Sequence, residues 1–231
     1  MIKVASYNIR KSVGLDRQRR PGRILDVINE INADIIALQE VDRRIGARQT
    51  TLPRALIAAE TDLKIIDIAT RPNSIGWHGN ALLVRKDIEV LGWRRHDIPV
   101  LEPRGAISAD LVVRGVAIRA VGMHLGLLNR FRKQQIRALN QQMLSFDQPM
   151  ATLIMGDSNE WRPEGSLSEF GPDFTVATPG PSFHSARPVA ALDRIILHKD
   201  LELLAGEVHA SALARIASDH LPIWADIHKP V

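Results

Sequence analysis

Short apolar runs repeatedly end in polar side chains along this chain. The clearest case is residues 152–156, Thr-Leu-Ile-Met-Gly, which are followed at once by Asp157 and, two positions on, by Asn159. A continuous apolar run of this length is typical of a strand covered on both faces. Gly156 allows a close turn where the strand stops. The residue types that follow also dominate ordinary turns, so this stretch by itself fits a turn as well as it fits a polar site.

The period of the apolar positions predicts the secondary structure. Alternating or continuous apolar residues predict strands over 2–9, 34–40, 63–68, 81–84, 88–93, 106–113, 116–124, 152–156, 192–197, 201–209 and 223–227. Apolar residues three and four positions apart predict helices over 21–32, 53–59 and 128–146. Segments 99–103 and 161–181 are predicted to be loops, and Arg114-Gly115 a tight turn. Strands outnumber helices and follow one another like hairpins, which favours an α/β or α+β sandwich of sheets with helices outside.

Composition limits the organisation and the chemistry. The 231 residues contain no linker-like stretch, no sequence repeat and no low-complexity block, which predicts a single domain over 1–231. Cysteine is absent, so disulfides and thiolate metal sites are excluded. No signal-like or membrane-length apolar run stands out, which predicts a cytoplasmic protein. We expect it to be a monomer.

The charge favours anionic partners. The net charge is +4 and the pI is near 9.7, values that suit nucleic acid, phospholipid headgroups or small phosphates. The excess comes from three clusters of basic residues, around Arg19, Arg44 and Arg132. Each cluster fits a solvated face equally well, and the third lies on a predicted helix. Aromatic residues are scarce and no stacking platform stands out, which weakens the case for nucleic acid.

The polar residues at strand ends form one predicted constellation. Its members are Asn8, Glu40, His124, Asp157 with Asn159, Asp193, and Asp219 with His220. Each has an ordinary structural explanation: an asparagine caps turns, a glutamate pairs with arginine, and a histidine fits into a core. Because the ends of buried strands hold side chains rigidly, their recurrence at one kind of position indicates a site.

The motifs around these residues resemble those of the endonuclease/exonuclease/phosphatase superfamily, in the same order along the chain. They are Tyr7-Asn8-Ile9, Leu38-Gln39-Glu40-Val41, His124-Leu125, Gly156-Asp157-Ser158-Asn159, Leu192-Asp193-Arg194-Ile195 and Ser218-Asp219-His220-Leu221-Pro222. The resemblance implies a four-layer sandwich, in which two packed, mostly antiparallel sheets are flanked by helices. It also implies a site for Mg²⁺, or Mn²⁺, at the strand ends. Glu40 would be the main metal ligand, assisted by Asn8 and Asp219.

The same resemblance assigns roles in hydrolysis. Asp157 would orient and deprotonate the attacking water, and Asn159 would hold that water or a phosphoryl oxygen. His220 would contact the phosphate while Asp193 orients its other ring nitrogen and raises its pKa. His124 is left for electrostatic stabilisation or for protonating the leaving oxygen. These needs match phosphodiester hydrolysis, in which positioning and charge neutralisation dominate.

The substrate stays open between classes. His124-Leu125 resembles the branch that contains deoxyribonuclease and neutral sphingomyelinase more than the abasic-site endonucleases. Arg104 and Asn80 are candidate substrate contacts, whereas Ser158, Glu160 and His184 receive no role. We expect a phosphodiesterase acting on nucleic acid. A phospholipid or small-molecule phosphodiesterase or phosphatase is the alternative, and a catalytically silent binding module is the second alternative.

Overall fold

Two six-stranded sheets pack face to face in the computed structural model, which describes residues 1–99, 104–146 and 148–230. The first sheet has the order β11 (Glu202–Val208), β12 (Ile223–His228), β1 (Ile2–Asn8), β2 (Ile35–Gln39), β4 (Ala81–Arg85) and β3 (Leu63–Ile65). The second has the order β5 (Glu89–His96), β6 (Gly105–Val113), β7 (Val116–His124), β8 (Thr152–Asp157), β10 (Asp193–His198) and β9 (Phe174–Ala177).

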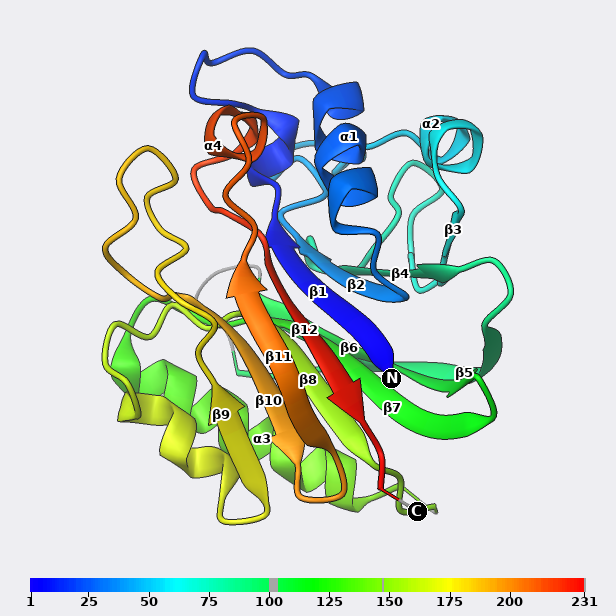
Figure 1. Cartoon of the computed structure of the whole chain (residues 1–231), viewed down its shortest axis with the longest axis vertical. Helices are drawn as coiled ribbons and strands as arrows, with labels where there is room; N and C mark the ends of the chain where they lie inside the picture. Colours follow the sequence, from blue (N-terminus) through cyan, green and yellow to red (C-terminus); the bar gives the residue numbers. More distant parts are fainter. Residues whose placement is uncertain (100–103, 147, 231) are drawn as a thin grey trace.

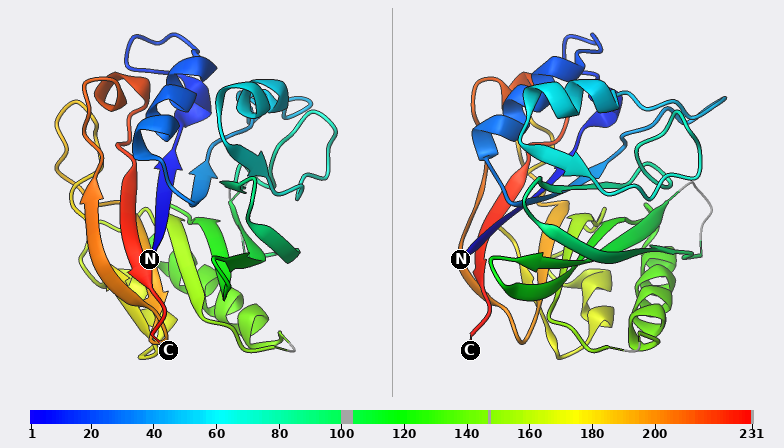
Figure 2. Two further views of the ribbon diagram at one scale, coloured as in Figure 1. Left: turned by 45° about the vertical axis from the view of Figure 1, so that its right-hand side comes forward. Right: turned by 90° about the vertical axis from the view of Figure 1, so that its right-hand side faces the viewer.

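Helices cover the outer face of each sheet. Figures 1 and 2 show α1 (Pro21–Ile31), α2 (Arg54–Glu60) and the short α4 (Ala214–Ala217) on the first sheet, and α3 (Asn129–Leu144) on the second. The short 3₁₀ segments η1 (Arg10–Ser12) and η2 (Gly165–Phe170) complete the list. Separate apolar clusters fill the space between the sheets and the space under each set of helices. The predicted four-layer sandwich is therefore confirmed.

The two sheets share one topology. Each contains a single parallel pair, β1–β2 or β7–β8, joined by a helical crossover, and its remaining neighbours are antiparallel. The last paired residues are Asn8 with Gln39 in the first sheet and His124 with Asp157 in the second. Because the carboxyl ends of parallel strands meet at one edge, each sheet gathers polar groups there. The face-to-face packing of β1 on β8 brings the two edges together.

Most predicted elements are present, and the differences have local causes. The predicted hairpin is confirmed, and its Gly115 adopts the left-handed φ of 78° that the turn needs. The predicted helix over 21–32 ends at Ile31, since Asn32 is left-handed and stops it. The predicted loop 161–181 instead contains η2 and the four-residue strand β9, which is too short to show a clear period. Within the predicted loop 99–103, residues 100–103 lie outside the described part of the chain.

Candidate active site

Asp157, the last residue of β8, lies where the two sheets meet. Its side chain is buried, and its Oδ2 atom accepts a hydrogen bond of 2.9 Å from Asn8 Nδ2 of the first sheet. The same oxygen lies 3.3 Å from His124 Nε2 and 3.7 Å from His220 Nε2. Its Oδ1 atom accepts the backbone N–H of Asn159 at 3.0 Å. One carboxylate therefore joins groups from both sheets.

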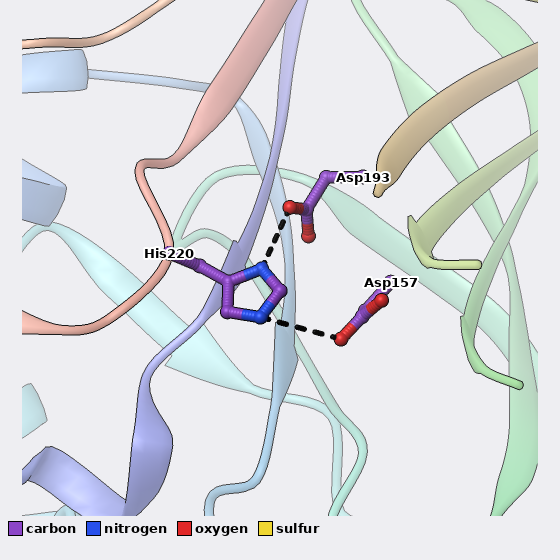
Figure 3. A group of neighbouring side chains, drawn as sticks. All are labelled: Asp157, Asp193 and His220. Atoms are coloured by element: carbon purple, nitrogen blue, oxygen red, sulfur yellow. Dashed lines mark hydrogen bonds and ion pairs between the residues drawn. The ribbon is translucent and has the colours of Figure 1, made fainter. Parts of the chain in front are cut away.

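His220 is held between two carboxylates (Figure 3). Its Nδ1 atom lies 2.9 Å from Asp193 Oδ2, as predicted, and its Nε2 atom faces Asp157. Ser182 Oγ donates to the same Asp193 oxygen at 2.5 Å. Burial alone would lower the pKa of His220, but the carboxylates of Asp193 and Asp157 outweigh it and raise the pKa to about 10. The imidazole is therefore cationic at neutral pH.

The charges around Asp157 keep it ionised. Burial alone would raise the pKa of this carboxyl, but the positive charges at His220 and His124 outweigh burial and hold the pKa well below its usual range. A carboxylate with so low a pKa is a weak base but a strong hydrogen-bond acceptor. The arrangement suits the orientation of a water molecule by Asp157, while His124 and His220 lie close to the same carboxylate oxygen.

The predicted metal ligands of the first sheet are paired with cations. Glu40 follows β2 in a left-handed conformation, with φ of 58°. Its carboxylate contacts Lys11 Nζ and, at 3.3 Å, Arg44 NH2. Burial would raise the pKa of Glu40, but the nearby charges of His124 and Lys11 lower it overall. Asp219 Oδ2 lies 3.2 Å from Arg10 Nε. Glu40 and Asp219 are thus paired with cationic side chains, and a metal cation could take the place of these side chains.

The donors at the site fit a hard divalent cation. Oxygen ligands such as the Asn8 amide and the Glu40 and Asp219 carboxylates suit Mg²⁺ or Mn²⁺. Within the described residues, however, the compact trio of acidic and histidine groups is Asp157, Asp193 and His220, whose ligand atoms lie within 4.8 Å of one another. This trio is a second possible position for a metal ion, because it combines two carboxylates with an imidazole. The assignment to Glu40, Asn8 and Asp219 stays a prediction.

Arg104 and His124 form a second buried pair. The Arg104 guanidinium lies against the His124 ring, with NH1 2.8 Å from Nδ1. Asn80, in contrast, is fully buried at the start of β6. Its Nδ2 atom donates a hydrogen bond of 3.1 Å to Gly105 O. Arg104 therefore lies next to the catalytic candidates, whereas Asn80 supports the chain that carries Arg104.

The loop after Asp157 is anchored by side chains without a predicted role. Ser158 Oγ donates to Leu192 O at 2.7 Å. Glu160 accepts hydrogen bonds from Arg132 NH2 at 2.9 Å and from Ser166 Oγ at 2.7 Å. Asn159 Nδ2 donates to Leu125 O at 2.9 Å. The loop that presents Asp157 and Asn159 is thus fixed to β7, β10 and α3.

Several residues of the site escaped the sequence analysis. Lys11 has a weak signal, since it is a basic residue three positions after Asn8. Ser182 has none, because a lone serine in a loop has many other uses. Trp161 and Phe183 lie ring against ring, with centroids 6.3 Å apart, and Phe183 lies 5.0 Å from the His220 ring. The 64% exposed Trp161 therefore stands beside the catalytic candidates.

This sandwich, with carboxylates, imidazoles and amides gathered at one edge, defines a class of phosphoester hydrolases. The chain belongs to the Endonuclease/Exonuclease/phosphatase family, which it matches over residues 5–220. This confirms the predicted family and the metal dependence that the family implies.

Relatives of the chain include both characterised and uncharacterised proteins. It is 30% identical to the uncharacterised protein YbhP of Escherichia coli (strain K12), over 98% of this chain and 96% of that protein. Its fold is similar to that of an endonuclease/exonuclease/phosphatase from Bacteroides vulgatus, with a TM-score of 0.80, 20% identity and 99% of each chain covered.

Two further similar structures belong to proteins associated with a nucleic-acid product or a sugar phosphate. The first is D. rerio TDP2 complexed with a single-strand DNA product, with a TM-score of 0.76, 14% identity and 99% of each chain covered. The second is a mannosyl-6-phosphatase of Bacteroides thetaiotaomicron, with a TM-score of 0.75, 16% identity, and 99% of this chain and 100% of that chain covered. At these identities the likeness shows the fold alone.

Among the described residues, no helix is long and apolar enough to cross a membrane.

Proposed function

We propose that the protein is a divalent-metal-dependent hydrolase that cleaves phosphodiester bonds by in-line attack of water. The observation that carries the proposal is the ionised Asp157, held between Asn8, His124 and the cationic His220 at the meeting edge of the two sheets. This geometry supplies an acceptor for a water proton and a positive charge for a phosphoryl oxygen within one small space.

The residues of the chain divide the work. Mg²⁺ or Mn²⁺ held by Glu40, Asn8 and Asp219 would neutralise charge on the phosphate. Asp157 orients the attacking water and takes up its proton only as the water oxygen bonds to phosphorus, because formation of that bond makes the water strongly acidic.

Three other side chains act on the phosphate and its leaving group, and a fourth supports one of them. Asn159 steadies the water or a phosphoryl oxygen. His220, kept cationic by Asp193, stabilises the negative charge that spreads over the phosphoryl oxygens. The bond from phosphorus to the leaving oxygen breaks, and His124 supplies a proton to that oxygen.

Nucleic acid is the substrate class that we favour. The basic charge of the chain supports it, and so does the exposed Trp161 beside Phe183, a ring on which a base can stack. The likeness to TDP2 with a single-strand DNA product supports the same class. The second candidate is a small phosphoester or a phospholipid, which the likeness to a mannosyl-6-phosphatase favours. We further propose that residues 1–231 act as one domain and as a cytoplasmic monomer.

A substrate panel tests the proposal. The purified protein would be incubated with Mg²⁺ or Mn²⁺ and single- and double-stranded DNA, RNA, sphingomyelin, cardiolipin or inositol phosphates. Cleavage of DNA or RNA alone is the expected result. Cleavage of lipid or inositol phosphate alone would rule out nucleic acid as the substrate and favour the second candidate. If bis(p-nitrophenyl) phosphate is not hydrolysed with either metal, the protein is a silent binding module and the proposal fails.

A further inference from the structure

A basic pocket lies next to Glu40. Glu40 and His124 are among its lining residues, so it is continuous with the catalytic candidates. Five cationic side chains line it: Lys11, Arg43, Arg44, Arg48 and Arg104. We call this space the basic pocket. The cluster around Arg44, which the sequence allows to be an ordinary solvated face, therefore borders the site.

The carboxylates of the basic pocket do not balance its cations. Only Glu40 and Asp42 supply acidic groups among its lining residues. Glu40 is shared by Lys11 and Arg44. Asp42 is buried and accepts a hydrogen bond of 2.5 Å from Ser74 Oγ, and burial raises the pKa of Asp42. The positive charge of the pocket thus exceeds its negative charge.

Two arginines of the basic pocket lack an ionic partner. Within the described residues, neither Arg43 nor Arg48 forms a salt bridge or a side-chain hydrogen bond. His78, which also lines the pocket, has a buried Nδ1 atom without a hydrogen-bond partner. A guanidinium binds phosphate through two parallel N–H donors. Two unpaired guanidinium groups and an unused imidazole nitrogen match a dianion better than a single negative charge.

We propose that the basic pocket binds a second phosphate group of the substrate, a phosphomonoester dianion located next to the scissile phosphodiester. The inference rests on the proposed function, because it places this group beside the bond that Asp157 attacks with water. It narrows the substrate to molecules that carry a terminal phosphate in addition to the diester. The chemistry is the same whether a nucleotide or a lipid headgroup carries that phosphate.

Paired probes test the proposal. The first pair is the p-nitrophenyl ester of thymidine 5′-phosphate with and without a 3′-phosphate, and the second pair replaces thymidine with glycerol. We expect the wild-type protein to prefer the phosphorylated member of at least one pair by about tenfold or more in kcat/KM, chiefly through KM. The pair that shows the preference identifies the carrier.

Substitution of the unpaired arginines locates the effect. The double variant Arg43→Ala, Arg48→Ala should bring the preference close to one, whereas Arg215→Ala, which removes an exposed arginine on α4 outside the pocket, should leave it unchanged. A wild-type protein without a preference, or a double variant that keeps it, overturns the inference. Thermal melting of the variants checks that the fold is intact.

Binding without turnover separates this inference from the proposed function. If no probe is hydrolysed, the proposed function fails, and calorimetric titration of the metal-free protein with inorganic pyrophosphate then decides on the pocket. The inference predicts that the double variant binds pyrophosphate about tenfold more weakly than the wild type or the Arg215→Ala variant. Equal affinities would show that the pocket does not hold a phosphate.

Discussion

The two sheets have the same topology, but their polar edges differ in exposure and in the partners of their carboxylates. In the second sheet, Asp157 and Asp193 are almost fully buried and face imidazoles. In the first sheet, Glu40 and Asp219 keep 14% and 23% of their side chains exposed and face the flexible side chains of Lys11 and Arg10. One edge thus holds a buried network of Asp157, Asp193 and His220, which we call the relay. The other edge holds carboxylates whose flexible ionic partners can exchange.

The register of the two parallel strand pairs shows that a small difference in position separates the two carboxylates. Asn8 pairs with Gln39 at the end of the first parallel pair, and His124 pairs with Asp157 at the end of the second. In the second sheet the carboxylate belongs to the last paired residue and stays inside. In the first sheet it belongs to the next residue, Glu40, whose left-handed backbone turns it outward. A shift of one residue thus separates a buried carboxylate from a partly exposed one.

The largest expected effect is on the relay. Asp157→Asn should lower kcat for bis(p-nitrophenyl) phosphate by about a thousandfold, because the amide cannot accept the proton of the water and no longer balances two imidazoles. Steady-state kinetics measure this, with Asp87→Asn at an exposed position as the control. Turnover that stays within about tenfold of wild type would remove Asp157 from its role.

The next expected effect is on stability, and it concerns the buried carboxylate of Glu160 in the loop after β8. The Glu160 carboxylate is held by Ser166 and Arg132: burial would raise its pKa, but the Ser166 hydrogen bonds and then Arg132 outweigh it and lower the pKa to about 2. A lowered folded-state pKa adds stability above the unfolded value, and this stability is lost as pH falls from about 4.5 through 2. It amounts to roughly 3 kcal/mol.

Glu160→Gln should therefore lower the free energy of unfolding at pH 7 by about 3 kcal/mol, since the buried Arg132 loses its ionic partner. Urea unfolding at several pH values measures this, and the loss should shrink below about pH 3. Asp67→Asn, which breaks the exposed pair with Arg54, is the control and should cost less than about 1 kcal/mol. Equal losses for both variants would contradict a special role for the buried pair.

Metal binding distinguishes the two edges directly. Glu40→Gln should weaken Mn²⁺ binding about 10- to 100-fold, as measured by electron paramagnetic resonance on the protein without substrate. Asp193→Asn should change it by less than about threefold, because Asp193 is buried and its Oδ2 atom is already engaged by His220 and Ser182. The opposite order would place the ion in the trio of Asp157, Asp193 and His220.

The smallest expected effect is on the support of the relay. Ser182→Ala removes one hydrogen-bond donor from Asp193 Oδ2 and leaves the pair with His220 in place. We expect a loss of about 1 kcal/mol in the free energy of unfolding and a decrease in kcat of only a few-fold. Ser185→Ala removes a similar buried hydroxyl that contacts Ser218 O instead, so it should destabilise without the change in kcat.

Sequence reasoning located the strand ends but not their geometry. Apolar runs that end in polar residues identify Asn8, Glu40 and Asp157, because the period of a buried strand is visible locally. The contact between Asn8 and Asp157 joins residues 149 positions apart and depends on the packing of two sheets. The shared topology is also hidden, since equivalent positions hold Gln39 in one sheet and Asp157 in the other. The basic pocket was missed because exposed arginines look alike until the fold places them.

The pairing of β1 with β12 makes the site depend on segments that lie far apart in the chain. Ile2 lies opposite Ile227, so this strand pair joins residues 225 positions apart. Asp157 contacts Asn8 from the first strand and His220 from the segment before the last one. A folding intermediate in which β12 has not yet docked on β1 therefore does not hold His220 against Asp157. Assembly of the site requires long-range pairing within the first sheet and its packing on the second, and no local strand pair achieves it.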